Sequence, residues 1–163
     1  MNLPPKRVLF VCIGNSCRSQ IAEGFARAYG SDVMTVRSAG LAPASTIASL
    51  TYQTMQEWNI TLQGQFPKSL DTFPFGEQFD LLINISGHPL PLTYNAQVES
   101  WDVQDPIGQS PEIYRQVANQ LEGMVMALIL RLRAERTKQT ELERAQRRSG
   151  RRGLGRALGP SRS

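Results

Sequence analysis

Two cysteines and an arginine lie in one short segment, Cys12-Ile13-Gly14-Asn15-Ser16-Cys17-Arg18-Ser19. An apolar run ends at Cys12 and a helical pattern begins at Arg18, so the segment is predicted to join a buried strand to a helix N-terminus. Such a junction presents free backbone N–H groups and the positive end of a helix dipole, which together bind anions. The Arg18 guanidinium adds paired donors that suit two oxygens of a phosphate-like group. The segment therefore predicts a pocket for one tetrahedral oxyanion.

The same features favour Cys12 as a nucleophile. The N–H groups, the dipole and Arg18 all stabilise a thiolate at this place, and Ser19 can donate a further hydrogen bond to the sulfur. Other residues of the segment accept tight or unusual turns, namely Gly14, Asn15 and Ser16. The alternative is that Cys12 is only a small buried residue at a strand end. The combination of these residue types in one strand-to-helix turn favours chemistry.

The rest of the composition indicates one globular domain without a disulfide framework. The chain has 163 residues, of which 40% are hydrophobic and 20% charged. Cys12 and Cys17 are too close in sequence to join distant parts of the fold, and one histidine, His88, is too few for a zinc site. We expect no metal. No apolar run is long enough for a membrane span and the N-terminus lacks signal-peptide sections, so a cytoplasmic location is expected.

Charge is distributed unevenly along the chain. Residues 1–130 contain seven Lys/Arg and eleven Asp/Glu, whereas residues 131–163 contain eleven Lys/Arg and three Glu. We therefore predict a domain over residues 1–133, followed by a basic, Arg- and Gly-rich tail over residues 134–163 that is disordered. A solvated tail is favoured over a contact with nucleic acid or another acidic surface, because charge runs are commonly just solvated.

Strand and helix patterns alternate along the domain. Continuous or alternating apolar runs predict strands over residues 7–12, 33–37, 80–85 and 98–103. Helical spacing predicts helices over residues 18–29, 45–58 and from Pro111 to about Arg133. This alternation is typical of an α/β fold, with a parallel sheet and helices on both faces.

The segment from Val8 to Gly24 resembles the opening of the low-molecular-weight protein tyrosine phosphatase superfamily, which also contains arsenate reductases. The resemblance covers roughly residues 7–130 and continues through Ser38-Ala39-Gly40, Pro67-Lys68-Ser69-Leu70 and Trp101-Asp102-Val103-Gln104-Asp105-Pro106. It implies the phosphatase I fold, a four-stranded parallel sheet flanked by helices, with no metal or organic cofactor. It also implies that Asp105 is the general acid, with Asp102 as the fallback, and that Ser38 braces the loop.

The resemblance leaves two activities open. A phosphatase would form a phosphocysteine at Cys12 and hydrolyse it with help from Asp105. An arsenate reductase would attack arsenate through Cys12, and a second thiol would then release arsenite. Arg18-Ser19-Gln20 followed by Ala22-Glu23-Gly24 is similar to the reductase form. Ile107 and Gly108 also stand where phosphatases of this class tend to carry aromatic residues.

One departure weighs against the reductase activity. Thioredoxin-coupled reductases carry two further cysteines after the third strand, but this chain has Ser86 at the first place and no cysteine beyond Cys17. Reduction would need an external thiol system, such as glutathione with glutaredoxin, mycothiol or thioredoxin, or Cys17 as a redox partner. We favour an arsenate-reductase-like enzyme, with a phosphatase acting on a phosphorylated substrate as the alternative. A module that only binds phosphate would not require Cys12, Arg18 and Asp105 together.

Overall fold

The structure, a computed structural model, describes three stretches of the chain: residues 3–73, 79–91 and 96–157. Four strands form one sheet in the order β2-β1-β3-β4, namely β1 (Lys6–Cys12), β2 (Met34–Gly40), β3 (Leu81–Asn84) and β4 (Gln97–Ser100). All three strand pairings are parallel. The four predicted strands are therefore confirmed, with bounds that differ by a few residues. Because the strands are parallel, the loops after all four lie at the same edge of the sheet.

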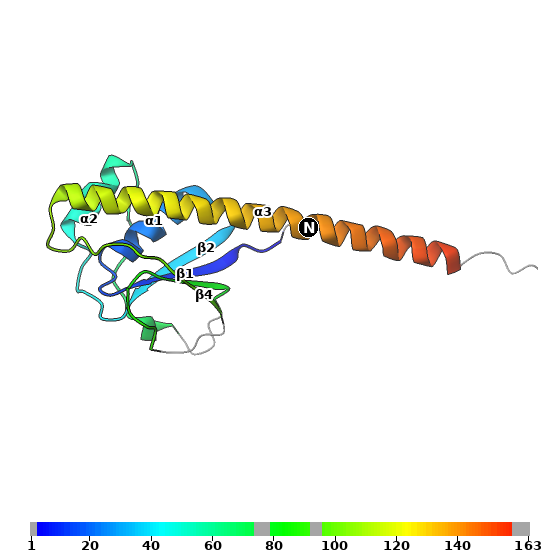
Figure 1. The fold of residues 1–163 in the computed structure, drawn as a ribbon, viewed down its shortest axis with the longest axis horizontal. Helices are drawn as coiled ribbons and strands as arrows, with labels where there is room; N and C mark the ends of the chain where they lie inside the picture. Colours follow the sequence, from blue (N-terminus) through cyan, green and yellow to red (C-terminus); the bar gives the residue numbers. More distant parts are fainter. Residues whose placement is uncertain (1–2, 74–78, 92–95, 158–163) are drawn as a thin grey trace, which may run out of the picture.

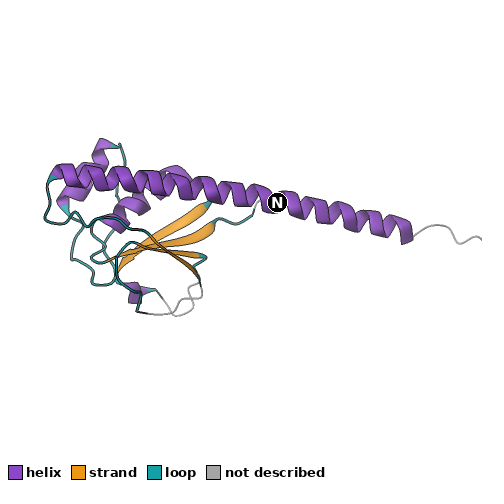
Figure 2. Ribbon diagram, viewed as in Figure 1, coloured by secondary structure: helices purple, strands orange, loops and turns teal. Residues whose placement is uncertain are grey.

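Helices cover the two faces of the sheet unequally. Three α-helices lie on one face: α1 (Arg18–Gly30), α2 (Ser49–Glu57) and α3 (Pro111–Ala157). The opposite face is covered by the short 3-10 helix η1 (Leu70–Thr72) with Phe73 and Phe79 (Figures 1 and 2). Strand β1 supplies both cores, because its alternate side chains point to opposite faces. The sheet is thus buried on both sides, as expected for parallel strands.

Helix α3 is longer than its apolar pattern predicts. The sequence predicts an end near Arg133 and disorder beyond it, but the helix continues to Ala157. Residues 158–163 of the predicted tail lie outside the described residues. Buried apolar side chains recur along the helix as far as Leu132, and the pattern is lost where the helix leaves the core. Good helix formers such as Ala, Glu, Gln and Arg then sustain the helix without burial.

The last contacts of α3 with the body are polar. The Arg133 guanidinium pairs with the Asp32 carboxylate at 2.9 Å, and Arg136 donates to the carbonyl oxygens of Asp32 and Leu3. Beyond this point the helix projects past the sheet and the N-terminus (Figure 1). Although α3 has 47 residues, no helix in the described stretches combines the length and apolar composition needed to span a membrane.

Candidate active site

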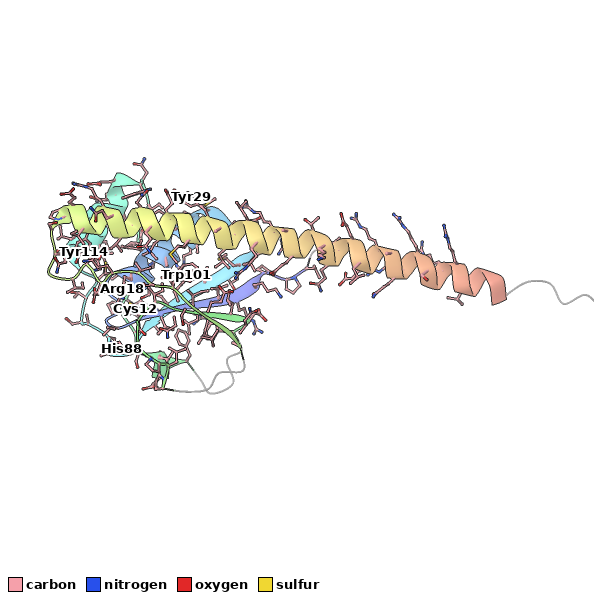
Figure 3. All side chains as sticks on the ribbon, viewed as in Figure 1. Cys12, Arg18, Tyr29, His88, Trp101 and Tyr114 are labelled. Carbon is pink, nitrogen blue, oxygen red and sulfur yellow. The ribbon has the colours of Figure 1, made fainter. Side chains whose placement is uncertain are left out.

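The predicted anion-binding segment is the connection between β1 and α1, at the edge of the sheet where the parallel strands end. We call residues 12–18 the oxyanion loop. Its two ends are buried: Cys12 is 2% exposed and Arg18 is 5% exposed. Figure 3 shows Cys12 and Arg18 together at this edge. The predicted strand–loop–helix arrangement is present.

The backbone of the oxyanion loop has its carbonyl groups occupied and its amide groups free. The carbonyl oxygens of residues 12, 13, 14 and 16 accept N–H groups from residues 41–48, which follow β2. The Asn15 carbonyl accepts from Gln20 Nε2 at 2.9 Å, and the Cys17 carbonyl accepts from the Ile21 amide at 2.8 Å. Within the described stretches, the backbone N–H groups of residues 13–18 have no hydrogen-bond partner. The loop can therefore offer several N–H donors to one anion.

Asn15 holds the loop in this conformation. It lies in the left-handed region with φ 49°, which asparagine tolerates better than most residues. Its buried Nδ2 donates to Ser19 Oγ at 2.7 Å and to Ser38 Oγ at 3.0 Å. Its Oδ1 accepts the Lys68 backbone amide at 3.0 Å. The bracing expected from Ser38 therefore takes place through Asn15.

Two glycines differ in how they serve the loop. Gly14 has no positive φ, and the nearest atom to a Cβ added there would be Ser16 Oγ at 3.4 Å. A Cβ on Gly40, in β2, would lie 2.6 Å from the Ile13 carbonyl oxygen and 3.0 Å from the Asn15 amide nitrogen. The glycine that the loop requires is therefore Gly40, which the sequence analysis noted only as part of a resemblance.

Cys12 receives a hydrogen-bonding partner from the first turn of α1. Its Sγ lies 2.8 Å from Ser19 Oγ, and both side chains are buried. Because Asn15 Nδ2 already donates to Ser19 Oγ, the serine hydroxyl proton is available for the sulfur. Ser19 therefore supplies a hydrogen-bond donor directly to the Cys12 sulfur.

Arg18 links the oxyanion loop to the connections that follow β3 and β4. Its Nη1 donates to the carbonyl oxygens of Ile85 at 2.8 Å and Val103 at 3.1 Å. Its Nη2 lies 3.5 Å from the Asp105 carboxylate, whose side chain is 44% exposed. Arg18 and Asp105, which are 87 positions apart in sequence, are thus brought together beside the loop. The Asp105 carboxyl is thus partly exposed to solvent and lies against the Arg18 guanidinium.

Cys17, the predicted redox partner, lies in a less reactive environment. It is 2% exposed, and burial raises the pKa of its thiol to about 12, with a smaller opposing effect from a hydrogen bond to Thr51. Thr51, on α2, also donates from Oγ1 to the Ser16 carbonyl at 2.9 Å. The Cys17 thiol therefore stays protonated near neutral pH, whereas a nucleophilic cysteine must be a thiolate.

Tyr114, on the first turns of α3, is a buried titratable residue of this region that the sequence does not predict. Its side chain is 2% exposed, and burial raises the pKa of its phenol to about 12, with further contributions from the charges of Cys17 and Asp105. Because its neighbours Ile113 and Val117 follow the helical apolar pattern, Tyr114 has no signal of its own in the sequence.

Ser86 and His88 form a small polar turn after β3. Ser86 Oγ donates to Asn84 Oδ1 at 2.6 Å, and its oxygen accepts the His88 backbone amide at 3.0 Å. This turn borders a cleft of about 490 Å³ whose lining includes Ile85, His88, Trp101, Asp102 and Val103. Two lining residues, Ile85 and Val103, also accept the Arg18 guanidinium through their carbonyl oxygens, but the lining includes no residue of the oxyanion loop.

Residues 7–139 match the low molecular weight phosphotyrosine protein phosphatase family. The chain is also 37% identical over 131 residues to the glutaredoxin arsenate reductase of Synechocystis sp., a match that covers 78% of this chain and 98% of that protein.

Solved structures agree with these sequence matches. The fold matches an arsenate reductase in the phosphate-binding state with a TM-score of 0.71 and 36% identity, over 78% of this chain and 98% of the other. The YwlE arginine phosphatase of Geobacillus stearothermophilus matches with a TM-score of 0.68 and 21% identity, over 82% of this chain and 97% of the other. The second likeness concerns the fold alone. The predicted phosphatase I fold is thus confirmed.

Proposed function

The chain belongs to the low molecular weight phosphotyrosine protein phosphatase family, and we propose that it reduces arsenate to arsenite through Cys12 and an external thiol. The observation that carries this proposal is the oxyanion loop, where Ser19 lies 2.8 Å from the Cys12 sulfur beside a series of unpaired N–H groups. The similarity to the glutaredoxin arsenate reductase of Synechocystis also supports the proposal. Arsenate and phosphate have the same tetrahedral shape, so the loop suits both ions.

The chemistry proceeds in two steps at one sulfur. Arg18 and the loop N–H groups hold arsenate. The Cys12 thiolate attacks arsenic and forms an S–As bond, and one arsenate oxygen leaves as water. Asp105, beside Arg18, supplies a proton to the departing oxygen. An external thiolate then attacks the Cys12 sulfur. An S–S bond forms, the S–As electron pair stays on arsenic, and arsenite leaves. A second thiol reduces the mixed disulfide and regenerates Cys12.

We assign the reducing thiol to an external molecule rather than to Cys17. Burial keeps the Cys17 thiol protonated, with its pKa at about 12, so it is a poor attacking group. Cys12 and Cys17 are the two cysteines of the sequence.

The second candidate is a phosphomonoesterase that forms a phosphocysteine at Cys12. Asp105 favours it, because a carboxyl group held 3.5 Å from the anion-binding arginine can protonate an alcohol leaving group and later activate water. Ile107 argues against a phosphotyrosine substrate. It is 47% exposed and stands at the position where phosphatases of this class tend to carry an aromatic side chain, which would support the substrate ring.

One set of assays separates the two candidates. The purified chain is given arsenate with glutathione and glutaredoxin, with mycothiol and mycoredoxin, or with thioredoxin, and in parallel an aryl phosphate. The reductase proposal expects arsenite with one thiol system and undiminished turnover in Cys17→Ser. Arsenite formation that disappears in Cys17→Ser would show that Cys17, and not an external thiol, resolves the adduct.

The phosphatase candidate makes the opposite prediction. Phosphate release without arsenite, reduced at least about tenfold in Asp105→Asn, would identify a phosphatase, because general acid catalysis contributes about 10²–10⁴-fold. Binding of phosphate without turnover of either substrate, unchanged in Asp105→Asn, would contradict both enzyme proposals and leave a binding module.

A further inference from the structure

The end of α3 carries a stripe of arginines that the chemistry of the oxyanion loop does not use. We call residues 144–157 the basic arm. Five of its six arginines fall at positions i, i+3, i+4, i+7 and i+8, which is the spacing of one helix face: Arg144, Arg147, Arg148, Arg151 and Arg152. The five span roughly 12 Å of helix axis at 1.5 Å per residue. From residue 144 to the end of the sequence there is no Asp or Glu.

Among the described side chains of residues 144–155, the basic arm has no contact with the body that would neutralise this charge. Residues 144–155 are all exposed, and the last described hydrogen bonds between α3 and the body come from Arg136. Figure 1 shows this part of the helix projecting beyond the sheet, and Figure 3 shows its side chains pointing into open space. The stripe is therefore available to a partner.

The composition of the basic arm selects the chemistry of that partner. The stripe consists of arginine, whose planar guanidinium pairs with phosphate oxygens in a bidentate way. An amphipathic helix that binds a lipid surface needs large apolar residues opposite its charges. The face opposite the stripe carries small or polar residues, namely Gln146, Ser149, Gly150 and Gly153, and Leu154 is the one large apolar side chain among residues 144–155. A lipid surface is therefore disfavoured.

The shape of the basic arm favours a duplex over a single strand. Single-stranded nucleic acids are held by aromatic side chains on which bases stack, and the sequence has no aromatic residue after Tyr114. A helix of ordinary width enters the major groove of B-DNA, which is about 12 Å wide, but not the narrow major groove of duplex RNA.

We propose that the basic arm binds the phosphate backbone of duplex DNA, without sequence preference, and so tethers this domain to it. The contact neutralises charges that otherwise repel one another along the i, i+4 rows of the helix. The arm also contains Gly150, Gly153 and Gly155, which weaken an isolated helix. Neutralised arginines therefore make the helix more stable when DNA is bound than when it is free. The proposal does not depend on which oxyanion Cys12 attacks.

Fluorescence anisotropy of the full chain with a labelled 20-base-pair duplex tests the proposal. Five phosphate contacts predict a slope of log K against log salt of about −4.5, hence a loss of about 500-fold between 50 and 200 mM NaCl. The test variant replaces four arginines by glutamine: Arg147→Gln, Arg148→Gln, Arg151→Gln and Arg152→Gln. One remaining contact predicts a slope near about −1, and binding at 50 mM NaCl at least about 100-fold weaker.

A control variant removes four positive charges from exposed side chains of the body: Lys6→Gln, Arg7→Gln, Arg115→Gln and Arg131→Gln. It should bind the duplex within about threefold of the unaltered chain. Both variants should retain turnover at Cys12, which shows that they fold. Circular dichroism at 222 nm should gain helical signal when duplex is added to the unaltered chain and not to the arm variant.

Several results would overturn the proposal. Equal binding by the arm variant and the unaltered chain would exclude the stripe as the contact. Equal losses of duplex affinity in the arm and body variants would show that net charge, and not the arginine stripe, accounts for the binding. Binding to anionic phosphatidylglycerol vesicles but not to the duplex would assign the arm to membranes, and tighter binding of single strands than of the duplex would contradict the argument from shape.

Discussion

The oxyanion loop and the basic arm are both rich in polar residues, but different forces fix their conformations. In the loop every carbonyl from residue 12 to residue 17 has a partner, and Asn15 and Ser19 are fully buried. In the arm residues 144–155 are exposed, and the backbone follows its local helical preference. The loop is shaped by the segments packed around it, whereas the arm is shaped by its own sequence. Substitutions should therefore have large effects on stability and turnover in the oxyanion loop, and small effects on both in the basic arm.

The largest effect is expected from Cys12→Ser. The substitution removes the only thiol of the oxyanion loop that lies beside Ser19, and a serine hydroxyl is not ionised near neutral pH. We expect turnover of arsenate and of aryl phosphate to fall by at least about 10⁴-fold, in line with the loss of other enzymatic nucleophiles. Phosphate binding, measured by calorimetry, should persist because the loop N–H groups remain. Turnover that survives the substitution would contradict the mechanism.

A matched pair of glycine substitutions compares the two regions directly. In Gly40→Ala the new Cβ would lie 2.6 Å from the Ile13 carbonyl oxygen, a backbone atom that cannot move without disturbing the loop. We expect a loss of about 1–3 kcal/mol in the free energy of unfolding, and at least about tenfold lower turnover. In Gly150→Ala the new Cβ meets no atom within 4 Å. Helix content should rise, because alanine favours the helix by about 1 kcal/mol, while turnover is unchanged.

Thermal unfolding, turnover and circular dichroism at 222 nm measure both members of this pair. For a chain of this size, 1 kcal/mol corresponds to roughly 2–4 °C in Tm. Normal turnover in Gly40→Ala would show that the loop does not depend on close approach by β2. A fall in turnover in Gly150→Ala would show that the basic arm and the oxyanion loop are coupled.

Two substitutions of Asn15 separate backbone conformation from hydrogen bonding. Asn15→Gly keeps easy access to the φ of 49° but removes the bonds to Ser19 and Ser38, whereas Asn15→Ala loses both. Because a left-handed conformation costs an L-residue roughly 1–2 kcal/mol, the alanine variant should be less stable than the glycine variant by about that amount. Both should lose at least about tenfold in turnover, because Ser19 is no longer oriented. Full activity in Asn15→Gly would show that the backbone conformation alone is sufficient.

The contrast between the regions also explains how far the sequence could predict the molecule. The strand–loop–helix segment could be predicted because its residues are contiguous, and a resemblance added the distant Asp105, which the structure brings within 3.5 Å of Arg18. The partners that complete the site could not be predicted in the same way. Lys68 and Thr51 reach it only through folding, and their own local patterns signal nothing but a loop and a helix.

The length of α3 was missed for the opposite reason. Apolar periodicity reports burial, and it ends after Leu132, where the helix leaves the core. The backbone continues as a helix to Ala157 because local propensity, not burial, supports it there. A loss of periodicity thus marks the end of a contact and not always the end of a helix.

The smallest effect is expected at Glu23, a buried acid on α1 behind the oxyanion loop. Its Oε1 pairs with Arg27 at 3.3 Å, but within the described stretches its buried Oε2 has no partner. Burial raises the pKa of the Glu23 carboxyl above its ordinary value of 4.5, against weaker opposing effects from the charges of Arg27, Lys68 and Arg37 and from the Ser38 side chain. The folded chain therefore binds this proton more tightly than the unfolded chain.

This difference fixes the sign of a pH effect. As the pH rises above about 4.5, the unfolded chain releases the proton first, so the Glu23 contribution to stability falls until the folded carboxyl has also ionised. Glu23→Gln removes this loss. It should be more stable than the unaltered chain at pH 8 by about 1 kcal/mol, the cost of one unsatisfied buried polar atom, and the difference should shrink toward pH 4. Glu57→Gln, which replaces an exposed acid paired with Arg115, should show little difference at pH 8. A stability difference for Glu23→Gln that is equal at both pH values would mean that packing, and not the buried charge, governs this position.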